Sequence, residues 1–356
     1  MRKIFIVIER RADYSRYKPI LELLDKDPFF QTHLVVTGIN LLKNHGEDIK
    51  KIISDGFTIQ ATLPMFKDKQ PDNGAEMVRS MSRFMTSVVD ELETAKPDLV
   101  LTGFDIGANL ATTVAAAHMN LPVAHIHFPA TKKAKARLIR MGENPNNIFV
   151  VGCPSLDLLV NSPKVSTKDL EKELDLDLSQ PTALVIQHPV TSEDTQSFDQ
   201  INQTIQAIQS LNIQSLFLLP NNDAGYSKII KKIKDSNLKW VTSLPIEKFV
   251  NLYRHIKVIV GNSSSGIHEA ATYKVPAVNI GTRQQGRERA RNVIDVDYDK
   301  AEIETALKKA IFDQEFRASL KDLKNPYGDG QTAPRIVKTL KSLDLNKLDL
   351  QKHFYE

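Results

Sequence analysis

Residues 257–271, KVIVGNSSSGIHEAA, decide the fold because they change secondary structure within a few positions. The run 257–260 is rich in β-branched residues, which indicates a strand buried on both faces. Apolar residues then recur at helical spacing from Ile267 onward. Between them, Gly261 allows a tight turn with unusual dihedrals, and Gly266 allows another backbone or a ligand to approach closely. The stretch predicts a strand–turn–helix unit of an α/β protein.

The turn also carries groups that bind anions. Ser263, Ser264 or Ser265 is expected to cap the helix, whose first N–H groups and positive dipole end favour a phosphate. Glu269 would repel a phosphate, but one turn further along it would accept both hydroxyls of a ribose, as acidic residues do in dinucleotide-binding folds. Together they indicate a nucleoside diphosphate site; the alternative is a well-capped helix with a surface glutamate.

The same order of strand, turn and amphipathic helix repeats along the whole chain. Helices are predicted at 17–24, 75–95 and 106–119. Strands are predicted at 3–8, 32–36, 99–101, 123–126 and 148–151, and in a second series at 183–187, 215–219, 240–242, 258–260 and 277–280. Continuous Val, Ile and Leu runs are typical of parallel sheets, and the alternation with helices predicts a doubly wound α/β fold.

The two series predict two domains, as a length of 356 residues also favours. The break is expected near 161–164, which gives Rossmann-like domains at 1–163 and 164–340 that face each other across a cleft. The polar, Leu-punctuated tail 341–356 is predicted to form a final helix that packs back on the body. Ligands of such sheets bind beyond the carboxyl ends of the strands, so the informative residues are those that follow each strand.

Composition excludes several classes of protein. With 41% hydrophobic and 25% charged residues and a net charge of +4, the chain is predicted to be globular and not to bind nucleic acid; the basic run 132–137 is expected to be a solvated helix face. A single cysteine, Cys153, excludes an intramolecular disulfide and is expected to be a small buried residue. No apolar run suits a signal peptide or a membrane span, which predicts a cytoplasmic protein without a membrane partner.

Polar residues follow the other strands as well. Arg283 and Arg287 come after 277–280 at helical spacing, and each guanidinium suits a phosphate. His188 follows 183–187, where a ligand would lie, although a single histidine is also often structural. Asn221 and Arg11 occupy corresponding positions after two further strands. Polar loops at corresponding positions indicate a single site.

These residues resemble the UDP-N-acetylglucosamine 2-epimerase family, in particular its hydrolysing branch, which serves the synthesis of sialic, legionaminic and related acids. The order and spacing of the motifs are specific and cover nearly the whole chain: RRADYS, KPDLVLTGFD, PVAHIH, VGCPSLD, QHPVT, LPNNDAG, GNSSSGIHEA, NIGTRQQGR and YGDGQTAPRI. The resemblance implies the glycosyltransferase-B fold of two Rossmann-like domains, in agreement with the layout of the strands. It also implies a homodimer or homotetramer formed through helices of the N-terminal domain.

The resemblance implies binding roles at matching positions. Ser263, Ser264 and Arg283 would hold the diphosphate, and Glu269 would hold the ribose. Arg11 would reach the phosphates from the opposite domain.

It also implies catalytic roles. His188 would lie beside the pyrophosphate and help UDP to leave, and Asp105 falls where the family carries a catalytic aspartate. Asn221 would have a binding role, in the nucleotide pocket. The family has Gly-Asp-Arg at that aspartate, whereas this chain has Phe104 and Ile106 on either side, so an arginine contact is lost or supplied elsewhere.

A second departure follows His127. The family continues with Gly-Gly-Glu and then an Asp-x-Ser-x-Arg-His segment that bears catalytic carboxylates, but here Phe128 follows directly. Either the natural protein carries a loop that this sequence omits, or it lacks that loop; the sequence leaves both open.

The predicted activity is hydrolysing 2-epimerisation: UDP-N-acetylglucosamine and water give N-acetylmannosamine and UDP, by elimination of UDP and then addition of water. Asp105 would act as the base, Arg11, Arg283 and His188 would stabilise departing UDP, and the chemistry requires no metal or other cofactor. Alternatives are the same chemistry on UDP-2,4-diacetamido-2,4,6-trideoxyglucose, a non-hydrolysing epimerase, a glycosyltransferase, and a UDP-sugar-binding protein without catalysis.

Overall fold

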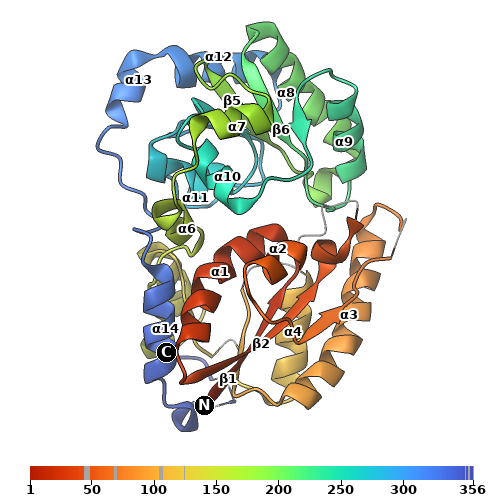
Figure 1. Cartoon of the computed structure of the whole chain (residues 1–356), viewed down its shortest axis with the longest axis vertical. Coiled ribbons are helices and arrows are strands. Elements are labelled where there is room, and N and C mark those ends of the chain that lie inside the picture. Colours follow the sequence, from red (N-terminus) through yellow and green to blue (C-terminus); the bar gives the residue numbers. More distant parts are fainter. Residues whose placement is uncertain are drawn as a thin grey trace. The chain divides into compact units, whose positions relative to one another are not determined.

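The computed structural model describes residues 1–43, 49–67, 70–103, 107–123, 125–348, 350–351 and 353–355. The chain divides into two compact units (Figure 1). The N-terminal unit comprises Met1–Pro71, Ala75–Asp157 and Tyr327–Glu356, and the C-terminal unit comprises Asp72–Gly74 and Leu158–Pro326. The chain therefore changes unit at 157–158, compared with the expected 163–164, and returns to the N-terminal unit at Tyr327.

The N-terminal unit is built on a parallel sheet. Its described residues form four strands in the order β3-β2-β1-β4, with bounds Ala61–Leu63 for β3, Phe30–Thr37 for β2, Arg2–Ile8 for β1 and Leu99–Leu101 for β4. Alternate residues of β1 are buried in two different clusters, one on each face of the sheet. A strand buried on both faces needs apolar residues throughout, which is why its sequence shows a continuous apolar run.

Helices cover both faces of this sheet. One cluster joins β1 to α1 (Arg11–Lys26) and α14 (Thr332–Ser342), and the other joins it to α3 (Gly74–Ala95) and α4 (Gly107–His118). The remaining helical segments described in or entering this unit are η1 (Gly38–Leu41), α2 (Ile49–Ser54), α5 (Lys132–Arg140), η3 (Pro145–Asn147), α6 (Ser155–Asn161) and η6 (Leu345–Lys347).

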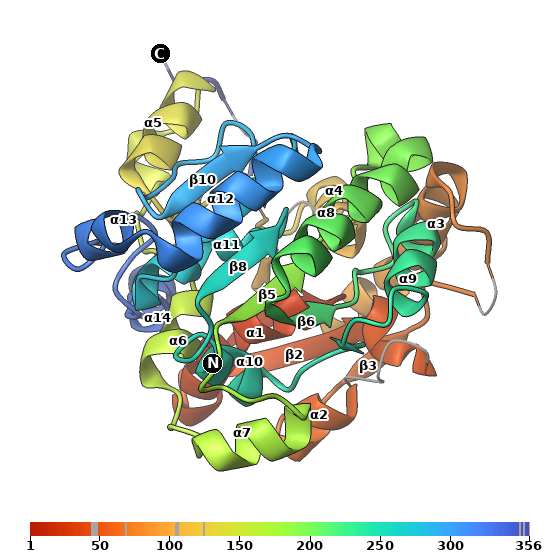
Figure 2. The same ribbon diagram turned by 90° about the horizontal axis from the view of Figure 1, so that it is seen from above.

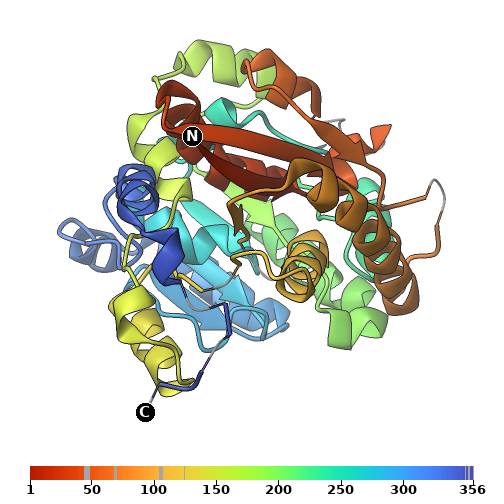
Figure 3. The same cartoon turned by 90° about the horizontal axis from the view of Figure 1, so that it is seen from below.

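The C-terminal tail differs from its prediction. The last long helix is α14, at Thr332–Ser342, so the helix precedes the tail instead of forming it. The end of the chain lies beside α5 (Figures 2 and 3), where the Tyr355 N–H donates to the Gly142 carbonyl. α5 itself buries no residue, which confirms the solvated helix face predicted for the basic run 132–137.

Two predicted strands are wrong. Residues 123–126 and 148–151 do not form strands in the described part of the chain; His127 and Ile148 make an isolated parallel bridge. Pro129 has no N–H to continue this pairing, so the ladder ends after one bridge. Two strands, β3 and β10 (Val293–Val296), were not predicted because they are short and not continuously apolar.

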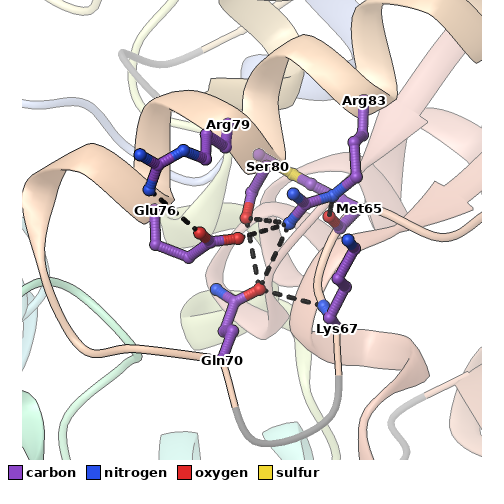
Figure 4. Close-up of polar contacts among 7 residues, drawn as sticks. All are labelled: Met65, Lys67, Gln70, Glu76, Arg79, Ser80 and Arg83. Atoms are coloured by element: carbon purple, nitrogen blue, oxygen red, sulfur yellow. Dashed lines mark hydrogen bonds and ion pairs between the residues drawn. The ribbon is translucent and has the colours of Figure 1, made fainter.

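A polar cluster holds the loop before α3 against that helix (Figure 4). Arg83 donates from Nε to the Met65 carbonyl at 3.2 Å and from Nη2 to Glu76 at 2.9 Å and Ser80 at 2.8 Å. Gln70 accepts from the same guanidinium at 3.4 Å. The hydrogen bond from Arg83 lowers the pKa of Glu76, so this carboxylate stays charged and the cluster fixes the first turns of α3.

The C-terminal unit contains a second parallel sheet. Its described residues form six strands in the order β10-β9-β8-β5-β6-β7, with bounds Ala277–Ile280 for β9, Val258–Gly261 for β8, Thr182–Ile186 for β5, Gln214–Leu218 for β6 and Trp240–Val241 for β7.

Helices cover both faces of this second sheet. One face packs on α8 (Ser197–Leu211), α9 (Tyr226–Lys234) and α12 (Lys300–Phe312), and α8 and α12 lie side by side in Figure 2. The other face packs on α7 (Thr167–Leu174), α10 (Ile246–Leu252) and η5 (Ala270–Tyr273). The other helical segments described are η4 (Thr191–Gln196), α11 (Ser265–His268) and α13 (Gln314–Ser319).

Two further predictions concern single features. Cys153 is buried, as predicted, with its sulfur 3.1 Å from the Ser155 hydroxyl. Within the described ranges, no helix combines the length and the apolar character that crossing a membrane requires.

Candidate functional site

Polar loops meet at one edge of the sheet in the C-terminal unit. The strands β5, β6, β8 and β9 are parallel, so their carboxyl ends lie at the same edge. The loops that follow them carry His188, Asn221, Ser263 and Arg283, four of the residues expected to form the site. Direct hydrogen bonds link these loops.

Asn262 is the centre of these bonds. Its side-chain Oδ1 accepts from the His188 N–H at 2.7 Å, and its Nδ2 donates to the His188 carbonyl at 2.8 Å. The side chain is fully buried, so both bonds are shielded from water. This pair of bonds fixes the backbone of the loop after β5 against the loop after β8.

The backbone of Asn262 fixes a third loop. Its carbonyl oxygen accepts from Gln284 at 2.7 Å and from Arg283 Nη1 at 3.2 Å. The loop after β9 is thereby tied to the same residue that holds His188. The sequence gives no local signal for this role of Asn262, because its partners are distant along the chain.

His188 also contacts the loop after β6. Its Nδ1 accepts from the Asn221 N–H at 3.4 Å, a geometry that places the proton of the neutral ring on Nε2. The residue is largely buried. An N–H on Nε2 is a donor of the kind that suits a phosphate oxygen.

Glycines make this convergence possible. Gly261 has φ +115°, and a Cβ at that position would lie 2.2 Å from the Ile186 carbonyl oxygen, so both the backbone and the space require glycine. A Cβ at Gly266 would lie 3.4 Å from the Ala277 Cβ, in ordinary contact. The close approach expected at Gly266 is therefore to β9.

The helix after the serines is shorter than expected. α11 covers Ser265–His268 and is followed by the 3-10 turn η5, so the helix-dipole contribution to anion binding is small. Ser264 is the N-cap but makes no side-chain capping bond, whereas the Ser263 hydroxyl accepts from the Ser265 N–H at 3.3 Å. Ser263 and Ser264 are both half-buried.

The two arginines expected at helical spacing instead lie in turns. Residues 281–287 are not helical. Arg287 is exposed, and its Nη1 lies 3.2 Å from the Nε2 of His268, away from the bonds that join Arg283 to Asn262. Arg283 and Arg287, which have the same predicted role, therefore have different environments in the structure.

Glu269 lies inside the unit and not on its surface. Its exposure is 6%, which excludes the alternative of a surface glutamate. Burial, and then the charge of Glu269, raise the pKa of the Tyr253 hydroxyl. Tyr253 also hydrogen bonds to Ser265 at the start of α11.

The remaining expected residues belong to the N-terminal unit. Arg11 is the first residue of α1 and is half-buried. Asp105, with its neighbours Phe104 and Ile106, lies outside the described residues.

Two buried carboxyl groups that were not predicted as site residues, Glu9 and Asp13, lie just after β1 in the chain. Glu9 Oε2 accepts from the Ala108 N–H at 2.8 Å, in the first turn of α4, and Asp13 Oδ2 accepts from the Arg10 N–H at 2.8 Å. Burial, and then the charge of Glu9, raise the pKa of Asp13 to about 7. The available signal was one acid, Glu9, directly after a continuous apolar strand and a second, Asp13, in the first turn of the helix that follows.

Comparison with known proteins identifies the family. The family model for UDP-N-acetylglucosamine 2-epimerase matches residues 22–127 and 124–341. The chain belongs to this family. A Legionella pneumophila protein named UDP-N,N'-diacetylbacillosamine 2-epimerase (hydrolyzing) is 33% identical over 99% of both chains. A Neisseria meningitidis UDP-N-acetylglucosamine 2-epimerase is 28% identical over 100% of this chain and 99% of its own.

Solved structures agree on the fold. The crystal structure of a Neisseria meningitidis UDP-GlcNAc 2-epimerase bound to UDP-GlcNAc is 18% identical, with a TM-score of 0.82 over 96% of this chain and 100% of that one. A structure of S. aureus MnaA with UDP is also 18% identical, with a TM-score of 0.78 over 100% of both chains. These matches, with the two parallel sheets, confirm the predicted glycosyltransferase-B fold.

Proposed function

We propose that this epimerase is of the hydrolysing type, releasing UDP and a free 2-acetamido sugar from its nucleotide sugar. The observation that carries the proposal is the set of bonds made by Asn262, which hold His188, Arg283 and the serine turn at one sheet edge. Protonated imidazole nitrogen, guanidinium and hydroxyl groups at one edge suit the charge that develops on a departing diphosphate. Two relatives named as hydrolysing, at 33% and 28% identity over nearly the whole chain, support this branch.

The chemistry assigns the groups to steps. The C2–H of an N-acetylated sugar is barely acidic, so inversion at C2 proceeds by removing that proton while UDP leaves from C1. Water then adds to the glycal-like intermediate. We assign Arg283, Ser263 and Ser264 to the diphosphate, His188 to the departing UDP and Glu269 to the ribose.

The N-terminal unit supplies the other proposed groups. Asp105 is assigned as the base at C2 through its match to the family motif, and Arg11 as a second cation for the phosphates.

Two sugars are candidates for the substrate. UDP-N-acetylglucosamine is the first expectation from the sequence. UDP-N,N'-diacetylbacillosamine, which is the 2,4-diacetamido-2,4,6-trideoxyglucose compound, is favoured by the names of the Legionella relative at 33% identity and a Campylobacter jejuni relative at 28%. Apolar Phe104 and Ile106 beside Asp105 also suit a 6-deoxy sugar. We therefore propose the diacetylated sugar as the substrate, with N-acetylglucosamine as the second candidate.

A binding protein without catalysis is the competing function. The family places catalytic carboxylates after the position of His127, where this chain continues directly with Phe128. The two segments of the family match also meet here, at 124–127.

One experiment separates these functions. The full-length protein is incubated with each UDP-sugar in D2O, and products are followed by NMR. Hydrolysing epimerisation releases UDP and a free sugar of inverted C2 configuration that carries deuterium at C2, because the proton lost there is replaced from solvent. Epimerised UDP-sugar without free sugar would indicate the non-hydrolysing reaction. UDP binding without turnover of either sugar would establish the binding protein and overturn our proposal.

The assignment of Asp105 has its own test. Asp105→Asn removes the base while keeping the shape of the side chain, so turnover is expected to fall by about 100-fold or more while the Kd for UDP is kept. Unchanged turnover would remove Asp105 from the mechanism.

A further inference from the structure

A cavity of about 350 Å3 lies in the C-terminal unit at the sheet edge opposite the candidate site. It is lined by residues that precede β8 and β9, among them Lys257 and Val275, whereas the candidate site is made by residues that follow the same strands. Its volume lies within the range of small-molecule sites. Nothing in the proposed reaction uses it.

The lining has a single sign of charge. Six of its residues are basic and none is acidic: Lys164, Arg254, His255, Lys257, Lys274 and Arg317. In the part of the chain that the structure describes, no carboxylate makes an ion pair with any of them. Burial, and then the charge of Arg254, lower the pKa of His255, and Glu171 opposes this shift. Cations gathered without counterions in a concave surface focus a positive potential.

The two arginines of the cavity are held in place by the protein. Arg254 donates to the Asn251 side chain, and its guanidinium carbon lies 5.2 Å from the ring centre of Tyr273. Arg317 Nη1 donates to the carbonyls of Ala310 at 2.9 Å and Lys257 at 3.3 Å. Each guanidinium has five N–H donors, so donors remain for a ligand on groups that are already oriented.

Two aromatic residues, Tyr253 and Tyr273, are among those that line the cavity. Tyr253 and Tyr273 stack with ring centres 6.3 Å apart and an interplanar angle of 18°. Tyr253 is fully buried, and its hydroxyl donates to the Ser265 carbonyl at 3.3 Å, on α11 of the candidate site. This hydrogen bond connects the cavity lining at Tyr253 to the start of α11 in the candidate site.

We infer that this basic cavity is a second ligand site, which binds a small anion carrying two or more phosphate charges. A multiply charged anion neutralises several of the clustered cations at once, whereas a monovalent anion leaves most of their repulsion in place. Phosphate oxygens match both kinds of cation present, the planar guanidinium forks and the lysine point charges. The inference stands apart from the proposed epimerase activity.

The test is calorimetric titration of the full-length protein with inorganic tripolyphosphate, at constant ionic strength and with saturating UDP present. UDP occupies the candidate site, so remaining heat reports a second site. The double variant K257A/K274A removes two exposed lysines of the rim, and K231A/K308A removes two exposed lysines of α9 and α12, with the same charge change.

We expect one tripolyphosphate to bind wild type and the control variant, with Kd at least about tenfold weaker in K257A/K274A, since that variant loses two charged hydrogen bonds to phosphate. No binding in wild type, or equal weakening in both double variants, would overturn the inference. Citrate binding as tightly as tripolyphosphate would overturn the assignment to phosphate. If UDP itself does not bind, the proposed function fails, while the difference between the two double variants still tests the cavity.

Discussion

The carboxyl end of β1 and the carboxyl ends of β5 and β8 are equivalent places in two parallel sheets, but different side chains make the hydrogen bonds there. After β1, the acceptors of free backbone N–H groups are carboxylates of the chain itself: Glu9 accepts from Ala108, and Asp13 accepts from Arg10. After β5 and β8, the fixed group is the neutral amide of Asn262. Half-buried Ser263 and Ser264 follow Asn262 in the chain, and half-buried Arg283 donates to its backbone carbonyl.

The difference shows how parallel sheets of one protein acquire different ligand preferences. Strand ends attract anions because helices and turns there expose N–H groups. In the N-terminal unit, carboxyl groups of the protein itself already accept from such N–H groups. In the C-terminal unit, a neutral side chain makes the structural bonds, and the side chains beside it are cationic or carry hydroxyls, which suit an external anion. We therefore expect the first edge to respond to pH and the second to respond to UDP.

The largest expected effect is the response of the β1 edge to pH. The pKa of Asp13 is raised from 3.8 to about 7, so between these values the folded protein holds a proton that the unfolded chain has released. The contribution of Asp13 to stability is thus fully present below pH 3.8 and is lost as pH rises through 7, by about 4 kcal/mol in total. Asp13→Asn, which cannot ionise, should remove this loss.

The measurement is urea unfolding followed by circular dichroism at pH 5 and pH 8. The free energy of unfolding of D13N relative to wild type should rise by about 3 kcal/mol between the two values, because the slope of about 1.4 kcal/mol per pH unit acts from pH 5 to the folded pKa of about 7. Asp25→Asn, an exposed carboxylate on the same helix, is the control and should run parallel to wild type. If the free energy of unfolding of D13N also changes with pH in parallel to wild type, burial does not raise the pKa of Asp13.

Most of the C-terminal sheet could be predicted from the sequence. The strands β5, β8 and β9 are continuous apolar runs, and such runs are dictated by burial on both faces, so their bounds matched within a residue or two. Because parallel strands end at one edge, the sequence also placed His188, Ser263 and Arg283 in neighbouring loops. These inferences need only local pattern and topology.

Features that depend on distant partners could not be predicted. Asn262 bonds a residue 74 positions earlier, and no local pattern shows that its amide is the fixed centre. The short α11 and the different environments of Arg283 and Arg287 likewise depend on tertiary packing. Residues 123–126 are apolar enough for a strand, but a strand exists only if a neighbour pairs with it along its length.

The next largest effect concerns the neutral amide itself. Asn262→Ala leaves the N–H and the carbonyl of His188 buried without their partners, which should reduce the free energy of unfolding of the C-terminal unit by about 3 kcal/mol. The single tryptophan, Trp240, lies in β7 and reports unfolding of this unit by fluorescence in urea. Asn202→Ala, on half-exposed α8 surface, is the control and should change stability by no more than about 0.5 kcal/mol. An equal effect of both changes would mean that Asn262 does not organise the edge.

The smallest effect compares two arginines of one loop. Arg283 is tied to the Asn262 carbonyl, whereas Arg287 lies 3.2 Å from His268 and is exposed. Arg283→Ala should weaken UDP binding by about 10- to 100-fold in calorimetry, the loss expected for a charged hydrogen bond to a phosphate. Arg287→Ala removes the same charge from the same loop and should change Kd by less than about threefold, since exposed charges are screened. Equal weakening by both variants would show that net charge, and not the position fixed by Asn262, draws the diphosphate to this edge.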